Sequence, residues 1–414
     1  MYFLYNTVIA SANIPLSMLK HFNKKINLFV EGRKNTFSKL SVIKEKDRVI
    51  WVHTASLGEF EQGRPIIENI RKEYPKHKIV LTFFSPSGYE VKKDYEYVDL
   101  VTYLPLDTPG NARQFLNYIH PELAIFVKYE FWPNYLRELG KRKIKTLLIS
   151  AIFREEQLFF KSYGGWMRNV LKNVSHFFVQ DENSMRLLNS IGVEDVTISG
   201  DTRFDRVYEI TKRDNSLDFL EEFCGDNLII VAGSTWPSDQ DWFESYINNF
   251  KTKRVKFIVA PHNIIKKEIK AFQRKLNLKS VLYSERVNED LSDVDVFIVD
   301  TIGILTKVYS VADIAFVGGG FRKGGLHNTL EPATFGVPVI IGPEYDKFKE
   351  AVDLVERGGV ISVKNQEEFN EELLHLVKDE NYRNRRGKIS GQYVASQLGA
   401  TDKIMHFINN QIDK

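Results

Sequence analysis

The stretch from Ala312 to Pro343 decides the fold predicted for this chain; it reads ADIAFVGGGFRKGGLHNTLEPATFGVPVIIGP. It predicts a strand, a glycine loop, a short helix and a second strand. Ile314 to Val317 is a short apolar run of the kind found in buried parallel strands. The glycines that follow allow positive φ and close approach of a ligand. A glycine loop that leads into a helix start is typical of an anion site, because free backbone N–H groups point at the ligand.

The start of the short helix is marked by Asn328, at the expected N-cap, and by Glu331, three residues later. This spacing is that of a capping box. From spacing alone, Glu331 either caps its own helix or binds a ligand, and His327 is either an ordinary loop histidine or part of a site. The glycines match neither GxGxxG nor GxxxxGK[ST], which disfavours a dinucleotide fingerprint and a P-loop.

Short apolar runs alternate with segments of helical spacing along the whole chain. In the first half these runs are Val49–His53, Ile79–Phe83, Leu100–Leu104, Leu123–Val127, Thr146–Ser150, Phe177–Gln180 and Val196–Ser199. In the second half they are Ile229–Ala232, Phe257–Ala260, Val281–Tyr283, Val296–Val299, Ile314–Val317, Val339–Ile341 and Val360–Val363. This alternation predicts an α/β chain with two parallel-sheet, Rossmann-like domains. Ligands of such sheets bind at the carboxyl ends of the strands.

The composition is that of an ordinary globular protein. The 414 residues are 43% hydrophobic and 27% charged, which fits about two to three domains. A net charge of +3 gives no signal for nucleic-acid binding. The single cysteine, Cys224, excludes a disulfide within the chain, and no Cys/His cluster has metal-ligand spacing. The pair Asp293 and Asp295 mimics a metal-binding DxD, but we interpret it as the solvated start of a strand.

The first 19 residues carry no charged side chain, although Pro15 and several polar residues interrupt the run. A membrane-spanning helix needs about 20 mostly apolar residues, and a signal peptide begins with a basic region that is missing here. Basic residues follow the run: Lys20, Lys24, Lys25, Arg33, Lys34 and Lys39. The pattern predicts a segment that associates with an anionic membrane surface, either lying on it or spanning it. The alternative is a first helix packed on its domain.

Charged side chains follow several of the predicted strands. Glu59 lies in HTASLGEFE (53–61) at the start of a helix, where a carboxylate could also merely complement the helix dipole. Glu130 lies in KYEFWPN (128–134), beside Trp132, which we expect to pack in the core or between the domains. Arg154 ends another loop and is either a phosphate ligand or a solvated side chain. Arg203 lies in GDTRFD (200–205), near the end of the first domain.

These motifs, in this order over roughly residues 30 to 400, resemble the 3-deoxy-D-manno-octulosonic acid (Kdo) transferases. The resemblance rests above all on GGGF, GGLHNTLEPATFGVPVIIGP and SLGE. It implies a GT-B architecture, in which two Rossmann-like domains face a cleft. It also implies inverting, metal-independent transfer of Kdo from CMP-Kdo to a lipid A precursor, in the synthesis of the lipopolysaccharide inner core. The donor substrate is CMP-Kdo, and no cofactor is expected.

The resemblance assigns roles to three residues of the first domain. It makes Glu59 the catalytic base and Glu130 the group that stabilises the transition state. It places Arg203 near the departing phosphate, where the family usually has lysine, and Asp201 where the family has asparagine. Arginine keeps the positive charge but presents a planar fork instead of a point charge.

The residues implied to hold the CMP moiety lie in the second domain. They are Pro261, His262, Ile302, Gly303, Ile304, Asn328, Thr329, Leu330 and Glu331. Glu331 is expected on the ribose hydroxyls and His262 close to cytosine. The family often has an acidic residue at the position of Ile304, so the contact there is expected from the main chain.

The predicted domains are a membrane-associating segment (1–40), an acceptor-binding domain (41–208), a linker (209–226) and a CMP-sugar-binding domain (227–414). The implied partners are CMP-Kdo, a lipid A precursor and an anionic membrane surface, with no nucleic acid. The expected location is the cytoplasmic face of the inner membrane. Two alternatives remain. A nucleotide-sugar epimerase of the same fold would need no base at Glu59, and a non-catalytic nucleotide-sugar binding protein would turn nothing over.

Overall fold

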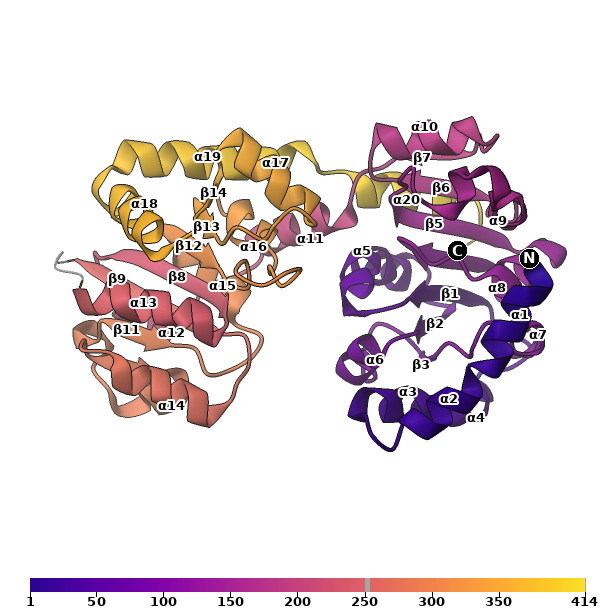
Figure 1. Cartoon of the computed structure of the whole chain (residues 1–414), viewed down its shortest axis with the longest axis horizontal. Coiled ribbons are helices and arrows are strands. Elements are labelled where there is room, and N and C mark those ends of the chain that lie inside the picture. Colours follow the sequence, from indigo (N-terminus) through magenta and orange to yellow (C-terminus); the bar gives the residue numbers. More distant parts are fainter. Residues whose placement is uncertain (250–253, 414) are drawn as a thin grey trace. The chain divides into compact units, whose positions relative to one another are not determined.

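Each half of the sequence forms a seven-stranded, fully parallel sheet with helices on both faces (Figure 1). The structure is a computed structural model that describes residues 1–249 and 254–413. It divides into two units, Met1–Asp205 with Leu398–Lys414, and Arg206–Gln397. Every strand expected from the apolar runs is present within the described ranges, with ends that differ by a few residues. Six of the strands (β1, β4, β9, β11, β12 and β13) are buried along their whole length, and most of the others at all but one position, because helices cover both faces of a parallel sheet.

The sheet of the first unit has the order β3-β2-β1-β4-β5-β6-β7. Its strands are β1 (Val49–Thr54), β2 (Lys78–Phe83), β3 (Leu100–Tyr103), β4 (Leu123–Val127), β5 (Lys145–Ala151), β6 (His176–Val179) and β7 (Val196–Ile198). Its helices include α5 (Leu57–Glu73), α6 (Pro86–Lys92), α7 (Pro109–Ile119), α8 (Pro133–Lys141), α9 (Gly165–Leu171) and α10 (Glu182–Ser190). The strand order changes direction between β1 and β4: β2 and β3 extend the sheet on one side of this pair, and β5 to β7 extend it on the other. In parallel sheets, ligands bind at the carboxyl ends of the two strands at such a switch point.

The sheet of the second unit has the order β10-β11-β9-β8-β12-β13-β14. Its strands are β8 (Leu228–Thr235), β9 (Val255–Pro261), β10 (Ser280–Leu282), β11 (Val296–Ile298), β12 (Ile314–Val317), β13 (Val339–Ile341) and β14 (Val360–Ser362). Its helices are α12 (Asp218–Cys224), α13 (Pro237–Asn249), α14 (Lys266–Lys275), α15 (Leu305–Val308), α16 (Leu330–Thr334), α17 (Lys349–Arg357), α18 (Gln366–Lys378) and α19 (Glu380–Ser396). In this sheet the strand order changes direction between β8 and β12, and the glycine loop begins at the carboxyl end of β12.

The N-terminal helices belong to the first unit; they are α1 (Tyr2–Ser11), α2 (Asn13–Leu19), α3 (Lys24–Lys34) and α4 (Thr36–Leu40). Helix α1 contacts the domain through polar side chains. The Tyr5 hydroxyl donates to the buried Asp107 at 2.7 Å, and Asn134 donates to Asn6 at 2.8 Å. Large apolar side chains point outward instead, with Phe3 84% exposed. Among the described residues, no helix has the length and apolar character required to cross a bilayer.

The basic flank expected after residue 19 is smaller than the sequence predicted. Arg33 is largely buried; it donates to the carbonyl oxygens of Leu104 at 3.0 Å and Phe84 at 2.6 Å, and burial lowers its pKa to about 9. Lys20 and Lys34 both form ion pairs with Glu31. Arg33 therefore holds α3 against the loops that follow β2 and β3, and its guanidinium is engaged by the domain itself.

The C-terminal segment returns to the first unit, which differs from the predicted division at residues 227–414. Helix α20 (Ala400–Asn409) packs Ile404, Met405 and Ile408 into the core beside β1 and β2. Asp205 accepts hydrogen bonds from the backbone N–H groups of Gly399 at 2.7 Å and Thr401 at 2.6 Å. The boundary also lies inside α11 (Thr202–Thr211), and not in the charged stretch 209–226, which contains α12.

Because Asp205 caps α20, Asp205→Ala should lower the unfolding free energy of the first unit by about 1–2 kcal/mol, the usual cost of a lost N-cap. Urea denaturation followed by fluorescence, with limited proteolysis near residue 398, measures this. Asp402→Ala is the matched control, because Asp402 is exposed on the same helix. Equal stability of the two variants would contradict the capping role.

Candidate active site

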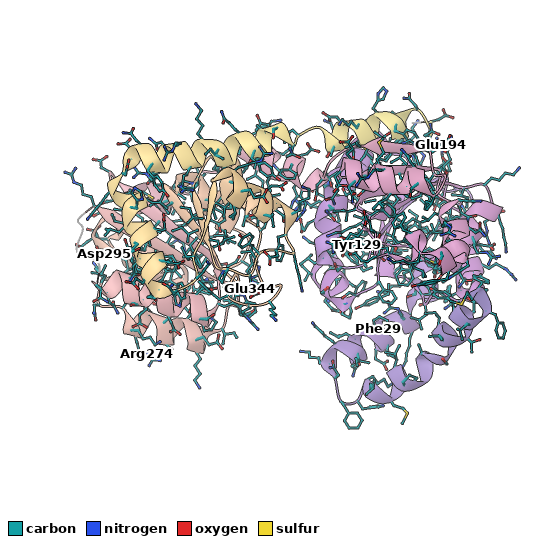
Figure 2. All side chains as sticks on the ribbon, turned by 45° about the horizontal axis from the view of Figure 1, so that its top comes forward. Phe29, Tyr129, Glu194, Arg274, Asp295 and Glu344 are labelled. Atoms are coloured by element: carbon teal, nitrogen blue, oxygen red, sulfur yellow. The ribbon has the colours of Figure 1, made fainter. Side chains whose placement is uncertain are left out.

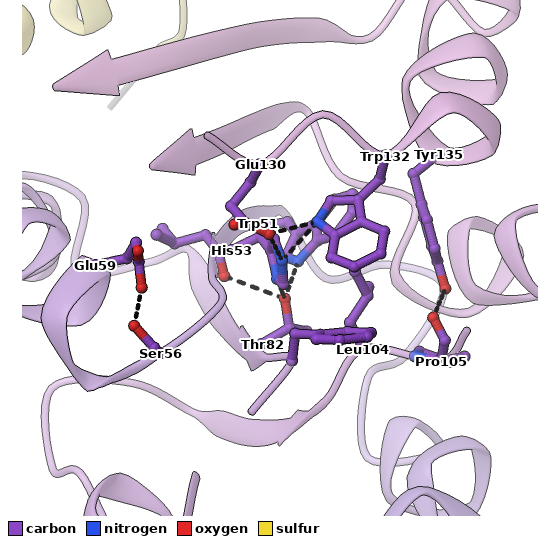
Figure 3. A network of polar contacts seen from close by, with 12 residues as sticks. Trp51, His53, Ser56, Glu59, Thr82, Leu104, Pro105, Glu130, Trp132 and Tyr135 are labelled. Atoms are coloured by element: carbon purple, nitrogen blue, oxygen red, sulfur yellow. Dashed lines mark hydrogen bonds and ion pairs between the residues drawn. The ribbon is translucent and has the colours of Figure 1, made fainter. Parts of the chain in front are cut away.

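Two glutamates follow β1 and β4, the neighbouring strands between which the strand order of the first sheet changes direction. Glu59 lies in the first turn of α5, directly after β1, and Glu130 lies in the loop after β4. Since β1 and β4 are neighbouring parallel strands, both side chains lie at the same edge of the sheet. Ser56 is the N-cap residue of α5, and its hydroxyl donates to the Glu59 carboxylate (Figure 3). Glu59 remains partly exposed.

Glu130 is held by a buried network (Figure 3). Its Oε2 lies 3.2 Å from Nε2 of His53 and accepts from Nε1 of Trp132 at 2.7 Å. On the other side of the ring, Nδ1 of His53 lies 2.8 Å from the hydroxyl of Thr82, which also accepts from Nε1 of Trp51 at 2.8 Å. The Glu130 side chain is 11% exposed, and His53 is fully buried. Trp132 is partly buried against the core of the first unit, and its indole N–H also makes a polar contact to the candidate site.

Charged groups gather around Tyr129, whose side chain Figure 2 labels in the first unit. The pKa of Tyr129 is raised, chiefly by burial. The positive charges of Arg154 and Arg203 lower this pKa, and the negative charge of Glu59 raises it further. Arg203 donates to the buried Asp201, with Nη2 to Oδ2 at 2.8 Å. Burial raises the pKa of Asp201, but Arg203 outweighs it and the net shift is downward. The two residues that depart from the family pattern are therefore partners.

Non-glycine residues with positive φ stand at the carboxyl ends of three strands. They are Lys128 (φ 69°) after β4, Ser150 (φ 49°) in β5 and Ser234 (φ 53°) in β8. Such conformations cost free energy and persist where the surrounding structure fixes them, often at functional sites. Their position agrees with a site at these edges.

In the second unit, three aromatic rings stack at the carboxyl edge of the sheet. His262, after β9, stacks on His327 of the glycine loop with ring centroids 4.2 Å apart, and Trp236 lies 4.5 Å from His262. Nε1 of Trp236 donates to Nε2 of His327 at 3.1 Å. Burial and then His262 lower the pKa of His327 to about 4, so this ring is neutral at pH 7. His327 is thus part of a built cluster, and not an isolated loop residue.

Asn328 and Glu331 lie together at the start of α16. Oδ1 of Asn328 accepts from the backbone N–H of Leu330 at 3.1 Å, and its Nδ2 donates to Oε1 of Glu331 at 3.2 Å. The helix begins at Leu330, one residue later than a capping box with Asn328 as N-cap predicts. Burial raises the pKa of Glu331, while Arg206 and Asn328 act in the opposite direction. The hydrogen bond that Glu331 accepts therefore comes from a side chain and not from the backbone of the helix start, as it would in a capping box.

The glycine loop has a structural reason for its composition. A Cβ on Gly318 would lie 2.4 Å from the carbonyl oxygen of Ser234, and one on Gly320 would lie 2.6 Å from the backbone nitrogen of Gly342. Asp239 accepts from the backbone N–H groups of Trp236 at 2.8 Å and of Gly319 at 3.0 Å. Close packing between loops requires glycine at these two positions, before any ligand is considered.

The remaining residues of the predicted CMP site lie on the same edge. Ile302 is 85% exposed, and Gly303, at φ 97°, has open space where a Cβ would stand, so its main chain is accessible. Ile304 is the N-cap of α15. Thr329 and Leu330 are buried, and the Thr329 hydroxyl has no hydrogen-bond partner within the described chain. Pro261, at the end of β9, is buried beside His262.

Among the residues that the structure describes, no group of three His, Cys, Asp or Glu side chains is arranged to hold a metal ion. Asp293 of the DxD-like pair forms an ion pair with Lys279 at 2.9 Å, before the start of β11. This agrees with the interpretation of that motif as a solvated strand start.

Comparison with known proteins gives the family. A family model described as 3-deoxy-D-manno-octulosonic-acid transferase (kdotransferase) matches residues 30–206. The Kdo transferase of Aquifex aeolicus is 30% identical over 372 residues, which cover 88% of this chain and 96% of that protein. The chain belongs to the Kdo transferase family. The Kdo transferase of Rickettsia felis is likewise 30% identical, over 80% of this chain and 72% of that protein.

Solved structures support the fold of this Kdo transferase family member. The UDP-GlcNAc 2-epimerase of Neisseria meningitidis has a TM-score of 0.59 at 16% identity, covering 87% of this chain and 99% of that one. MurG of Acinetobacter baumannii has a TM-score of 0.56 at 11% identity, covering 88% and 99%. At these identities the likeness concerns the fold alone, and it agrees with the predicted GT-B class. The family makes the chain a glycosyltransferase.

Sequence reasoning assigned no role to three residues of the two candidate sites: His53, Arg206 and Asp239. His53 lies inside an apolar strand, where a single histidine looks like a core residue. Arg206 lies at a predicted domain end, far in sequence from Glu331. For His53 and Asp239 the available signal was a position at or soon after a strand end, which in parallel sheets marks ligand-facing residues, whereas Arg206 lies inside α11 and offered no such signal.

Proposed function

We propose that the chain transfers Kdo from CMP-Kdo to a lipid A precursor in lipopolysaccharide biosynthesis, by inverting single displacement without a metal. The observation that carries the proposal is the 30% identity to the Aquifex aeolicus Kdo transferase over 96% of that protein's length. The two clusters of side chains at the carboxyl edges of the sheets support it, because acid–base groups lie on one unit and candidate nucleotide contacts on the other.

On the first unit, Glu59 acts as the base that removes the proton of the acceptor hydroxyl. A sugar hydroxyl is a poor nucleophile until a base takes its proton. The Ser56 hydroxyl orients the Glu59 carboxylate. Glu130 stabilises the positive charge that develops on the departing sugar, and Arg203 assists the departing phosphate. Because Asp201 neutralises much of the Arg203 charge, we expect its contribution to come mainly from hydrogen-bond geometry.

On the second unit, the CMP moiety of the donor binds at the edge between β8 and β12. The Glu331 carboxylate accepts hydrogen bonds from the ribose hydroxyls, and Asn328 fixes its orientation. The main chain of residues 302–304 and the buried Thr329 hydroxyl supply further polar contacts. The exposed ring of His262 offers a flat face to the cytosine, together with Pro261.

We further propose that the protein binds the cytoplasmic face of the inner membrane through an N-terminal apolar face. This face consists of the exposed side chains of Met1, Phe3, Leu4, Val8, Met18, Leu19 and Phe22. The exposed Lys24 and Lys25 follow it. A peripheral attachment of this kind combines buried apolar area with attraction to anionic lipids. It would also bring the first unit to the lipid acceptor.

Replacing Phe3, Leu4 and Phe22 by Ser should weaken binding to vesicles of phosphatidylethanolamine and phosphatidylglycerol by about tenfold or more, because each large side chain contributes about 1.5–3 kcal/mol when fully buried. Co-sedimentation measures the change. The polar contacts of α1 to Asp107 and Asn134 stay intact, so the fold is expected to persist. Val287→Ser is the control, since Val287 is 80% exposed on the other unit. Unchanged binding of the triple variant would contradict the assignment.

Mass spectrometry of the product from CMP-Kdo and a tetraacylated lipid A precursor tests the function, in reactions with and without EDTA. A product heavier by one or more Kdo residues in both reactions is the expected result. Binding of CMP without any product would favour a non-catalytic binding protein. Interconversion of a UDP-sugar, with no transfer of Kdo, would favour an epimerase of the same fold. Transfer abolished by EDTA would overturn the metal-independent mechanism.

A further inference from the structure

A fully buried histidine lies between the core of the first unit and the candidate site, and the proposed function gives it no role. His53 is the fifth residue of β1 and is paired in the parallel register with Thr82 of β2 on one side and Phe126 of β4 on the other. Its ring joins two hydrogen-bonding groups. One is the Thr82 hydroxyl in the core, and the other is the Glu130 carboxylate at the surface (Figure 3).

The donors and acceptors around the ring can be counted. Nε1 of Trp51 can only donate, so the Thr82 oxygen accepts from it. The proton of the Thr82 hydroxyl is then free for Nδ1 of His53, at 2.8 Å; its other acceptor, the Val52 carbonyl oxygen, lies farther away at 3.5 Å. With Nδ1 as the acceptor, the ring carries its proton on Nε2.

This assignment also satisfies the second donor at Glu130. Nε1 of Trp132 lies 2.7 Å from Oε2 of Glu130 and 3.0 Å from Nε2 of His53. If Nε2 carries a proton it cannot accept, so Trp132 donates to the carboxylate. All four hydrogen bonds then run in one direction, from Trp51 through Thr82 and His53, and from Trp132, to one carboxylate oxygen.

We propose that His53 is a positioning residue for Kdo transfer: as its Nε2–H tautomer it fixes the Glu130 carboxylate, so that Oε2 is held by the protein and Oε1 is presented to the substrate. The proposal rests on the proposed function. Within the described chain Oε2 takes both hydrogen bonds and Oε1 takes none. Thr82 fixes the tautomer, and Trp132 provides the second contact.

The geometry explains why a glutamate on this loop needs such support. The loop begins at Lys128, with φ 69°, and lies outside the hydrogen-bonded sheet. Trp132 is itself held by the ring of Phe84, with centroids 4.6 Å apart, and the guanidinium of Arg33 also packs on Phe84. A charge that stabilises a transition state must be fixed before the reaction, because small misplacements cost rate.

Two substitutions of the same residue separate positioning from packing. Glutamine places its Nε2 as many bonds from Cα as histidine places its own, so His53→Gln can still donate to Glu130. Asparagine reaches only the position of Nδ1, so His53→Asn can contact Thr82 but not Glu130. We expect His53→Asn to lower kcat about tenfold, as for one hydrogen bond to a charged group, with KM nearly unchanged. His53→Gln should recover most of that loss.

A double-mutant cycle with Glu130→Gln completes the test. If His53 acts through Glu130, His53→Asn should change kcat by less than about twofold in the Glu130→Gln background, because the group it positions is already altered. An equal loss in both backgrounds would overturn the proposal, and so would full activity of His53→Asn.

A readout that does not depend on turnover distinguishes this proposal from the proposed function. NMR of histidine labelled with ¹⁵N should show His53 as the Nε2–H tautomer, with a shift of its Nε2 signal in Glu130→Gln. An Nδ1–H tautomer would overturn the proposal even if the variants at residue 53 do not fold. If the parent protein transfers no Kdo, the proposed function fails and the positioning role of His53 in that reaction fails with it, whatever the tautomer.

Discussion

Replacing Glu59 by Gln should lower the rate of Kdo transfer by about 10²–10⁴-fold, or about 3–5 kcal/mol in activation free energy. Glutamine keeps the size of the side chain and its ability to hydrogen-bond with Ser56, but it cannot accept the proton of the acceptor hydroxyl. CMP affinity should stay nearly the same, because the proposed CMP contacts lie on the second unit. Single-turnover transfer and CMP calorimetry on the same preparation measure the two quantities.

The control for this experiment is Glu61→Gln, which neutralises the next carboxylate of α5 in sequence. It should retain most of the parental rate. A Glu59→Gln protein that transfers at more than about a tenth of the parental rate would fall short of the loss expected for a missing base. Glu130, at the same edge of the sheet, would then be the next candidate.

The second large effect is expected in donor binding. Glu331→Ala should weaken CMP binding by about 1–3 kcal/mol, because the ribose hydroxyls and Asn328 would lose a buried acceptor. Isothermal calorimetry with CMP measures the loss. Loss of thermal stability without loss of CMP affinity would show that Glu331 only supports the start of α16. Glu344→Ala, in the loop after β13 of the same unit, is the control (Figure 2).

The raised pKa of Glu331 adds a dependence on pH. Burial favours the protonated form of Glu331, whereas ribose hydroxyls need the ionised form as their acceptor. CMP affinity should therefore fall as pH decreases through this raised pKa, and CMP binding should release protons. The CMP affinity of Glu331→Gln should depend on pH only through the titration of CMP itself. The additional pH dependence of the parent protein should be lost in this variant. Identical pH profiles for the parent and Glu331→Gln would contradict this role.

Much of the fold was predictable because it depends on local pattern. The runs Leu123–Val127 and Ile314–Val317 became strands with those same ends, since a continuous apolar run can be buried on both faces only in a covered parallel sheet. Helix α8 begins at Pro133, because proline fits the first helical turn. Boundaries that depend on distant contacts were less accurate; α16 started one residue later than the capping box predicted.

The sequence by itself determined two parallel-sheet domains and placed Glu59, Glu130, Asn328 and Glu331 at the ends of strands and the starts of helices. These features follow from backbone propensity and apolar periodicity within a few residues. Only the tertiary structure decided which of these ends are neighbours. The strand order places β1 beside β4, which brings His53 to Glu130, and the return of α20 brings Gly399 to Asp205. Hydrogen bonds between residues far apart in the sequence leave no periodic trace in it, because their partners are chosen by the packing of whole elements.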